Sequence, residues 1–125
     1  MTINTGIFIY NEVEVLDFAG PFEVFTTASR VKSRQTKNTQ PFFNVFTIGE
    51  KKEVIRARGG LSIIPEYGVN GHPAIDLLII PGGVVTAAGI SAGIDMSLYL
   101  VSRLADSKLA LDTARQMEYN WKQNP

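Results

Sequence analysis

Ser91 is the side chain whose neighbours most closely match a known pattern for nucleophilic catalysis. Residues 89–93 are Gly-Ile-Ser-Ala-Gly, and Gly-x-Ser-x-Gly is typical of the sharp strand-to-helix turn that exposes the serine of α/β-hydrolases. In those enzymes an acid and then a histidine follow the serine along the chain, whereas His72, the single histidine here, precedes it. We therefore favour a tight turn in which Ser91 caps the next helix, with a Ser91-dependent hydrolase as the alternative.

His72 and the absence of cysteine restrict the remaining chemistry. His72 lies between Gly71 and Pro73, a turn-like setting in which a lone histidine is most simply solvated, and no cluster of ligands accompanies it. The 125 residues include no cysteine, which excludes a disulfide framework, a thiolate metal site and a cysteine nucleophile. We therefore expect no metal and no cofactor.

Two short apolar runs predict the strands that would position a site. Gly6–Tyr10 (GIFIY) is typical of a buried first strand. Asp76–Ile80 (DLLII) is the most hydrophobic run, and it leads into Pro81-Gly82-Gly83. This order is typical of a central parallel strand followed by a backbone turn of functional type.

The middle of the chain predicts a small hairpin. Phe43–Ile48 is strand-like, residues 50–53 form a charged turn, and Val54–Ala57 would be the returning strand, which Leu61–Ile64 continues after Gly59-Gly60. Before the hairpin, residues 32–40 (KSRQTKNTQ) have no apolar side chain and predict a surface loop.

Amphipathic patterns predict three helices. The first carries the stripe Phe18, Phe22 and Phe25. It should begin near Leu16 or Asp17, because Pro21 is tolerated only within about one turn of a helix start. After a strand-like run at Val84–Ala88, the second helix carries Ile94, Leu98, Val101 and Leu104. The third carries Ala110, Ala114, Met117 and Trp121, with Ser107 as its N-cap.

The distance along the chain between two of the predicted strands is too short. Only Pro81, Gly82 and Gly83 separate the run that ends at Ile80 from the one that begins at Val84, whereas a crossover between parallel strands needs a dozen or more residues. Three explanations are possible. Either residues 84–88 are not a parallel neighbour in the same subunit, or they dock in a partner by domain swapping, or the chain has lost residues between Gly83 and Val84. Spacing alone leaves these three alternatives open.

Three blocks of the sequence carry a resemblance to a known family. They are Val15–Phe25 (VLDFAGPFEVF), Asp76–Gly83 (DLLIIPGG) and Thr86–Met96 (TAAGISAGIDM). They resemble the ThiJ/PfpI superfamily of class I glutamine amidotransferase-like domains, most closely its isonitrile hydratase-like branch. Residues 114–121 (ARQMEYNW) resemble the ending of the same branch, so the resemblance covers most of the chain.

The resemblance implies a flavodoxin-like three-layer α/β sandwich with a mostly parallel sheet, commonly a homodimer, with a nucleophilic cysteine on a tight turn. Asp17 matches the carboxylate that contacts this cysteine, and Gly82 and Gly83 match the turn whose amides help to form an oxyanion site. The family's stretch with the cysteine is missing after Gly83, where the strand spacing is also too short. We therefore expect a truncated sandwich, internally deleted between Gly83 and Val84, in which Asp17 is a vestigial carboxylate.

Loss of the cysteine segment predicts a catalytically silent domain, because removing a nucleophile costs on the order of 10⁴ to 10⁶ in turnover. The missing stretch would include the family's central strand, so an apolar seam should remain for a partner chain to cover. We expect a homo-oligomer, domain-swapped in one alternative, that persists as a binding remnant and can take a small-molecule ligand. An active isonitrile hydratase or amidase is the alternative if the complete protein carries the missing stretch.

Composition restricts the partners. Twelve basic and twelve acidic side chains give zero net charge, which leaves no electrostatic footprint for nucleic acid or an anionic membrane. No run approaches the ~18 apolar residues of a membrane helix, and no basic region followed by an apolar stretch comes after Met1. We expect one cytoplasmic domain over residues 1–125. A sensing domain like the amidase-like halves of AraC-type regulators is a third class, although no helix-turn-helix segment is present.

Overall fold

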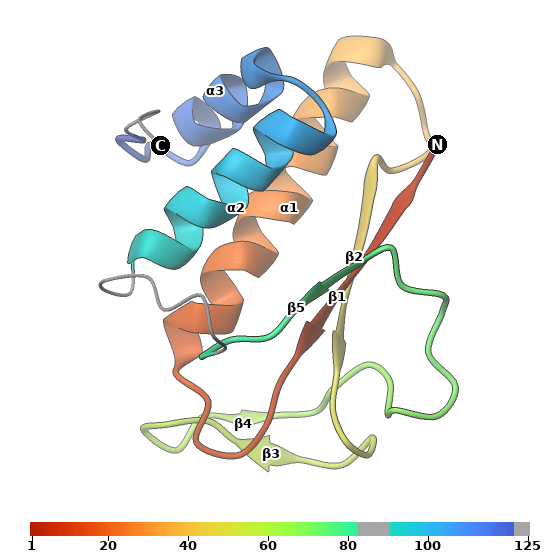
Figure 1. Ribbon diagram of the computed structural model, residues 1–125, viewed down its shortest axis with the longest axis vertical. Coiled ribbons are helices and arrows are strands. Elements are labelled where there is room, and N and C mark those ends of the chain that lie inside the picture. Colours follow the sequence, from red (N-terminus) through yellow and green to blue (C-terminus); the bar gives the residue numbers. More distant parts are fainter. Residues whose placement is uncertain (83–90, 122–125) are drawn as a thin grey trace.

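A parallel sheet with helices on one side forms the body of the molecule (Figure 1). The computed structural model describes residues 1–82 and 91–121, without the side chains of Ser91 and Ala92. In the described sheet β1 (Ile3–Phe8) lies in the middle, and β2 (Phe43–Ile48) and β5 (Leu77–Ile79) lie parallel to it on either side. The predicted α/β class with a mostly parallel sheet is confirmed. β5, expected to be central, is an edge strand among the described residues.

β1 begins three residues before the predicted start at Gly6. Two of the three added residues, Asn4 and Thr5, are polar, and Asn4 is held by hydrogen bonds: its amide donates to Asp76 Oδ2 at 2.8 Å, and its Nδ2 donates to the Ala74 carbonyl at 2.9 Å. Side chains alternate along the strand, so Ile3 and Ile7 face the helices while Gly6 lies on the other face. Hydrogen-bonded polar residues therefore lengthen a strand that the apolar pattern alone made too short.

α1 (Val15–Thr36) is longer than predicted at both ends. It begins one or two residues early, so that Pro21 lies in the second turn and leaves the Asp17 carbonyl without its helical donor. The predicted loop at residues 32–40 is wrong up to Thr36, and the helix ends at Lys37 in the left-handed conformation. Polar residues continue the helix because Val31 is buried and Gln35 Nε2 donates to Asp112 Oδ2 at 2.7 Å.

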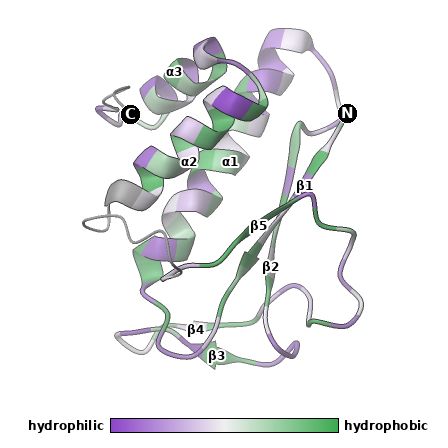
Figure 2. Cartoon of the chain, in the orientation of Figure 1, coloured by the Kyte–Doolittle hydropathy of each residue, from purple (hydrophilic) through white to green (hydrophobic). Residues whose placement is uncertain are grey.

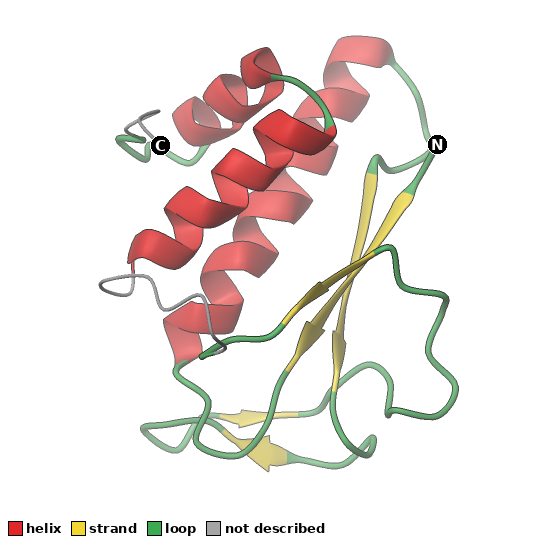
Figure 3. Ribbon diagram, viewed as in Figure 1, coloured by secondary structure: helices red, strands yellow, loops and turns green. Residues whose placement is uncertain are grey.

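The hairpin pairs different segments from those predicted. β3 (Ile55–Arg56) is antiparallel to β4 (Ser62–Ile63) across Gly59 and Gly60, both at positive φ, which confirms the turn. However, Val54–Ala57 does not return along β2. The β3 segment instead bonds to the turn after β1: the Glu12 amide donates to Arg56 O at 2.7 Å. Figure 3 shows the hairpin below the main sheet, under the start of α1.

α2 (Ser91–Leu104) and α3 (Ser107–Gln116) pack with α1 on the same side of the sheet. Leu98 and Val101 of the predicted stripe are fully buried. The N-cap of α3 is Asp106 rather than Ser107, because Asp106 Oδ1 accepts from the Leu109 amide at 2.7 Å. Met117 and Trp121 lie beyond the helix end, although both still pack against the core. The predicted strand at Val84–Ala88 lies outside the described residues.

The two faces of the sheet are covered unequally. Apolar side chains converge between the sheet and the helices, and in Figure 2 β5 is strongly hydrophobic whereas β1, β2 and α1 have mixed colouring. On the other face, Phe46 is covered by Tyr67, whose ring meets it edge-on at 5.4 Å. Leu78 and Ile80 remain 49% and 55% exposed. This strip agrees with the apolar seam that the sequence predicts.

Candidate functional site

The carboxyl ends of β1 and β5 define the candidate site. The chain passes from β1 to β2 on one side and then crosses to β5 on the other. In open α/β sheets, ligands bind outside the carboxyl ends of the strands where the order reverses in this way. Asp17 follows β1 through a short turn and Gly82 follows β5, so two of the three predicted site residues come from segments that meet at this edge.

Tyr10 joins the two segments. Its Oη donates to the Pro81 carbonyl at 2.5 Å. Gly82 has φ +74°, and a Cβ there would lie 2.8 Å from Tyr10 Oη. Both the left-handed backbone and the contact with Tyr10 therefore require glycine at this position.

Asp17 is available for a ligand. It lies in the first turn of α1, partly buried, where the positive end of the helix dipole favours a carboxylate. Among the described residues, no hydrogen bond or ion pair engages its side chain. Its own backbone carbonyl also lacks the amide that Pro21 cannot supply.

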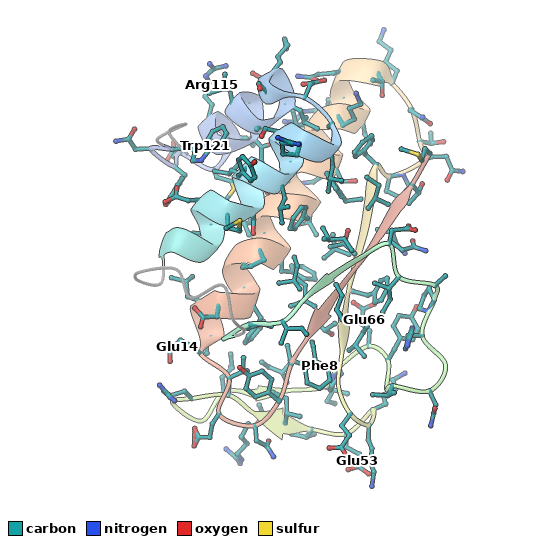
Figure 4. The ribbon with its side chains drawn as sticks, viewed as in Figure 1. Phe8, Glu14, Glu53, Glu66, Arg115 and Trp121 are labelled. Atoms are coloured by element: carbon teal, nitrogen blue, oxygen red, sulfur yellow. The ribbon has the colours of Figure 1, made fainter. Side chains whose placement is uncertain are left out.

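The turn between β1 and α1 is held from below by the β3–β4 hairpin. Glu14 lies at the base of α1 in Figure 4, and its Oε2 is 3.3 Å from Arg58 Nη1. Asn11 Oδ1 accepts from the Arg56 amide at 2.9 Å. Glu12 has φ +70°, and the hydrogen bond from its amide to Arg56 O helps to maintain this conformation. These contacts fix the direction in which α1 leaves the sheet, and thus the position of Asp17.

Comparison with known proteins identifies this architecture. No protein-family model and no curated protein matches the sequence. Solved structures match most of the chain, and three of them show the likeness. A ThiJ/PfpI family protein from Pseudomonas syringae has a TM-score of 0.77 at 14% identity, covering 100% of this chain and 77% of that one. An AraC family transcriptional regulator from Pseudomonas putida has a TM-score of 0.74 at 13% identity, over 92% and 99%. DJ-1beta from Drosophila melanogaster has a TM-score of 0.73 at 10% identity, over 97% and 100%. The chain has the DJ-1/ThiJ/PfpI fold.

The resemblance to the ThiJ/PfpI superfamily is thus confirmed at the level of the fold. Identities of 10 to 14% carry no information on activity, so the isonitrile hydratase-like branch stays a prediction. Gly83 and the side chain of Ser91 lie outside the described residues. Ser91 is the first described residue of α2, and its predicted role as a helix cap stays a prediction.

His72 does not join the candidate site. It precedes β5, at the amino-terminal edge of the sheet, whereas Gly82 follows β5 at the carboxyl edge. Its Nδ1 lies 2.8 Å from the Pro73 carbonyl. Among the residues described, no three histidine, aspartate or glutamate side chains gather as a metal site would require. In the same part of the chain, no helix is long and apolar enough to cross a membrane.

Tyr10 is the site residue that the sequence reasoning missed. It ends the apolar run GIFIY, where it was counted as part of a strand. The signal was its position, since the residue that follows a parallel strand of this fold lies at the ligand-binding edge. On the far side of Tyr10 an open hollow of about 400 Å³ lies between the segments after β1 and β2, with Phe8, Glu50 and Glu53 in its lining.

A carboxyl group with a lowered pKa, Asp112, lies away from this edge. Hydrogen bonds from Lys108 and then from Gln35 hold the pKa of Asp112 below its ordinary value. The Arg115 guanidinium, 3.1 Å from Asp112 Oδ1, acts in the same direction. Gln35 belongs to α1 and the other three residues to α3. Asp112 therefore joins two helices rather than serving the candidate site.

Proposed function

We propose that this chain is a catalytically silent domain of the DJ-1/ThiJ/PfpI fold, which persists as a self-assembling or small-molecule-binding module. The observation that carries the proposal is the absence of cysteine from all 125 residues. A thiolate is the nucleophile that the family resemblance implies, and no other side chain supplies its combination of acidity and nucleophilicity. Without it the fold keeps a binding edge but lacks the thiolate that would form the family's covalent intermediate.

The remaining site supports binding rather than bond cleavage. Asp17 and the Gly82 turn are present, and Tyr10 fixes the turn through the Pro81 carbonyl. The Pro81 carbonyl points at Tyr10, so the trans Pro81–Gly82 peptide directs the Gly82 amide the opposite way. This amide and the Asp17 carboxylate offer one donor and one acceptor to a small polar molecule. In this proposal Asp17 is vestigial as a catalytic group, and the chain is one domain deleted between Gly83 and Val84.

A Ser91-dependent hydrolase is the second candidate. The observation in its favour is that Ser91 is the first described residue of α2, since the Gly-x-Ser-x-Gly turn places its serine at a helix start. The position of His72 at the opposite edge of the sheet argues against it, because such a serine needs a base within hydrogen-bond reach. An isonitrile hydratase or amidase is the candidate if the complete protein carries the missing segment.

Turnover assays separate these candidates. Isonitrile hydration and ester cleavage should be measured for the wild type, for Ser91→Ala and for Ser102→Ala, a matched serine on the outer side of the same helix whose Oγ bonds only to Tyr99 O. We expect all three proteins to show the same background rate. Turnover that falls at least 100-fold in Ser91→Ala but not in Ser102→Ala would reject the silent domain in favour of a hydrolase.

Intact mass gives an independent check on the missing segment. The sequence corresponds to 13.7 kDa, and a βαβ crossover with a nucleophile turn would add several tens of residues at ~110 Da each. A natural protein of that larger mass would restore the hydratase assignment.

A further inference from the structure

The backbone of β1 shows which way the neighbouring strand β5 faces. The Ile3 amide donates to Phe42 O at 2.8 Å, and the Ile9 amide donates to Ile48 O at 2.8 Å. Successive backbone groups of a strand point to opposite sides. The odd-numbered residues of β1 therefore face β2, and the even-numbered residues face β5.

β5 consequently turns half of its backbone groups away from the sheet. Its register places Gly6 beside Leu78, between the pairs Thr5–Leu77 and Ile7–Ile79. With Gly6 turned towards β5, the parallel ladder uses the backbone groups of Leu77 and Ile79. The amide and carbonyl of Leu78 then point to the outer edge, and those of Ile80 continue on the same side. Among the described residues, no strand pairs with this edge.

The outer edge of β5 is only three residues long, but it lacks the charged side chains that protect many natural edge strands. From Leu77 to Ile80 there is no charged side chain, and Leu78 and Ile80 expose half of their surface on the face away from the helices. The nearest charge, Asp76, turns back to the Asn4 amide. By contrast, the carboxyl end of the outer edge of β2 is covered, because the Tyr67 amide donates to Thr47 O and the Tyr67 carbonyl accepts from the Gly49 amide. Edges left open, apolar and uncharged are templates for pairing with another chain.

We propose that the outer edge of β5 pairs antiparallel with β5 of a second copy, about a two-fold axis at Ile79. The inference rests on the proposed function, since it assigns the surface through which the domain assembles. A two-fold axis sets every charge against its own copy, so an uncharged edge is self-complementary where a charged one repels. In this register Leu78 lies opposite Ile80 of the partner subunit, and the outward amides and carbonyls of both residues are paired. Two exposed apolar side chains from each copy are covered at once.

Cysteine cross-linking tests the pairing and its register. The chain has no cysteine of its own, so each introduced thiol is unique. Residues opposite each other in a hydrogen-bonded antiparallel pair have Cα atoms about 5.5 Å apart, within the range of a disulfide. A mixture of Leu78→Cys and Ile80→Cys should form a disulfide-linked dimer under mild oxidation at least 10-fold faster than a mixture of Leu78→Cys and Leu111→Cys. Leu111 is 40% exposed on α3 and serves as the matched control.

A second test uses one variant that should weaken the dimer and one control variant, both of which should keep the fold. Leu78→Lys should raise the dimer dissociation constant at least 10-fold in light scattering, and Leu111→Lys should leave it unchanged, with circular dichroism of both variants matching the wild type. Equal cross-linking rates in the two mixtures would overturn the proposal. A wild-type chain that stays monomeric with a protected Leu78 amide would overturn it too, since another segment of the same chain would then occupy the edge. Neither result bears on turnover, so the silent domain is tested separately by the Ser91 assays.

Discussion

The two sides of β5 differ in backbone hydrogen bonding and in the burial of side chains. On the inner side β1 bonds to its backbone, and the partly buried Leu77 and Ile79 pack against a core in which Leu98 is 0% exposed. On the outer side its backbone has no partner among the described residues, and Leu78 is half exposed. Among the described residues, the sheet is therefore paired on the β1 side of β5 and unpaired on the other side.

Removing the same side chain from the two sides should give the largest contrast. Leu98→Ala empties a fully buried position and should lower the free energy of unfolding by about 3 kcal/mol. Leu78→Ala removes a side chain that water already reaches, and should cost under about 1 kcal/mol. Urea unfolding of both variants in dilute protein measures the difference. Equal losses would mean that Leu78 is buried as completely as Leu98.

The end of β5 is sensitive at the point where Tyr10 holds it. Gly82→Ala places a Cβ at positive φ and against Tyr10 Oη, whereas Gly71→Ala has a similar φ of +95° with nothing within 4 Å. We expect a loss of about 2 kcal/mol for Gly82→Ala and about 1 kcal/mol for Gly71→Ala. Adding Tyr10→Phe should relieve part of the Gly82→Ala loss, which a double-mutant cycle by urea unfolding detects. Strict additivity would rule out the contact.

On the helical side of the sheet, the cap of α3 should have a moderate effect. Asp106→Ala removes the acceptor of the Leu109 amide and should cost about 1 kcal/mol. Ser107→Ala, at the residue that the sequence pattern favoured, should change stability by less than about 0.3 kcal/mol, because the side chain caps nothing in the structure. Thermal melts of the two variants rank them directly, and the reverse order would restore Ser107 as the cap.

The smallest expected effect lies where α1 and α3 meet at Asp112. Its lowered pKa means that folding favours the carboxylate, so the stabilisation is present above the unfolded-state pKa and is lost as the pH falls through the folded one. Asp112→Asn should therefore lower stability by about 0.5 kcal/mol at pH 7, and the gap to the wild type should narrow at pH 3. Melting temperatures at both values test this, and a gap that does not change with pH would argue against a charged role.

Much of the fold follows from local patterns, and the errors share a cause. Apolar patterns alone predict β2, β5 and α1, because these elements pack apolar side chains against the core. The errors occurred where polar groups have hydrogen-bond partners far along the chain: Asn4 with Asp76, Gln35 with Asp112, and the Glu12 amide with the Arg56 carbonyl. Such pairs leave no periodic signal in the sequence.

The candidate site was predicted only in part for a similar reason. Asp17 and Gly82 entered through family resemblance, which also supplied Gly83 beyond the described residues. Tyr10 was missed, because its role depends on the Pro81 carbonyl 71 positions later. A tyrosine at the end of an apolar run has no local mark that distinguishes a strand residue from a clamp on another strand.

Hydrogen exchange at β5 tests most directly whether the sheet of a single chain ends there. In protein dilute enough to be monomeric, we predict that the Leu77 and Ile79 amides, which face β1, exchange slowly, and that the Leu78 amide between them exchanges at least 10-fold faster. Equal protection of all three amides would contradict the account, because the outer edge would then already have a strand beside it.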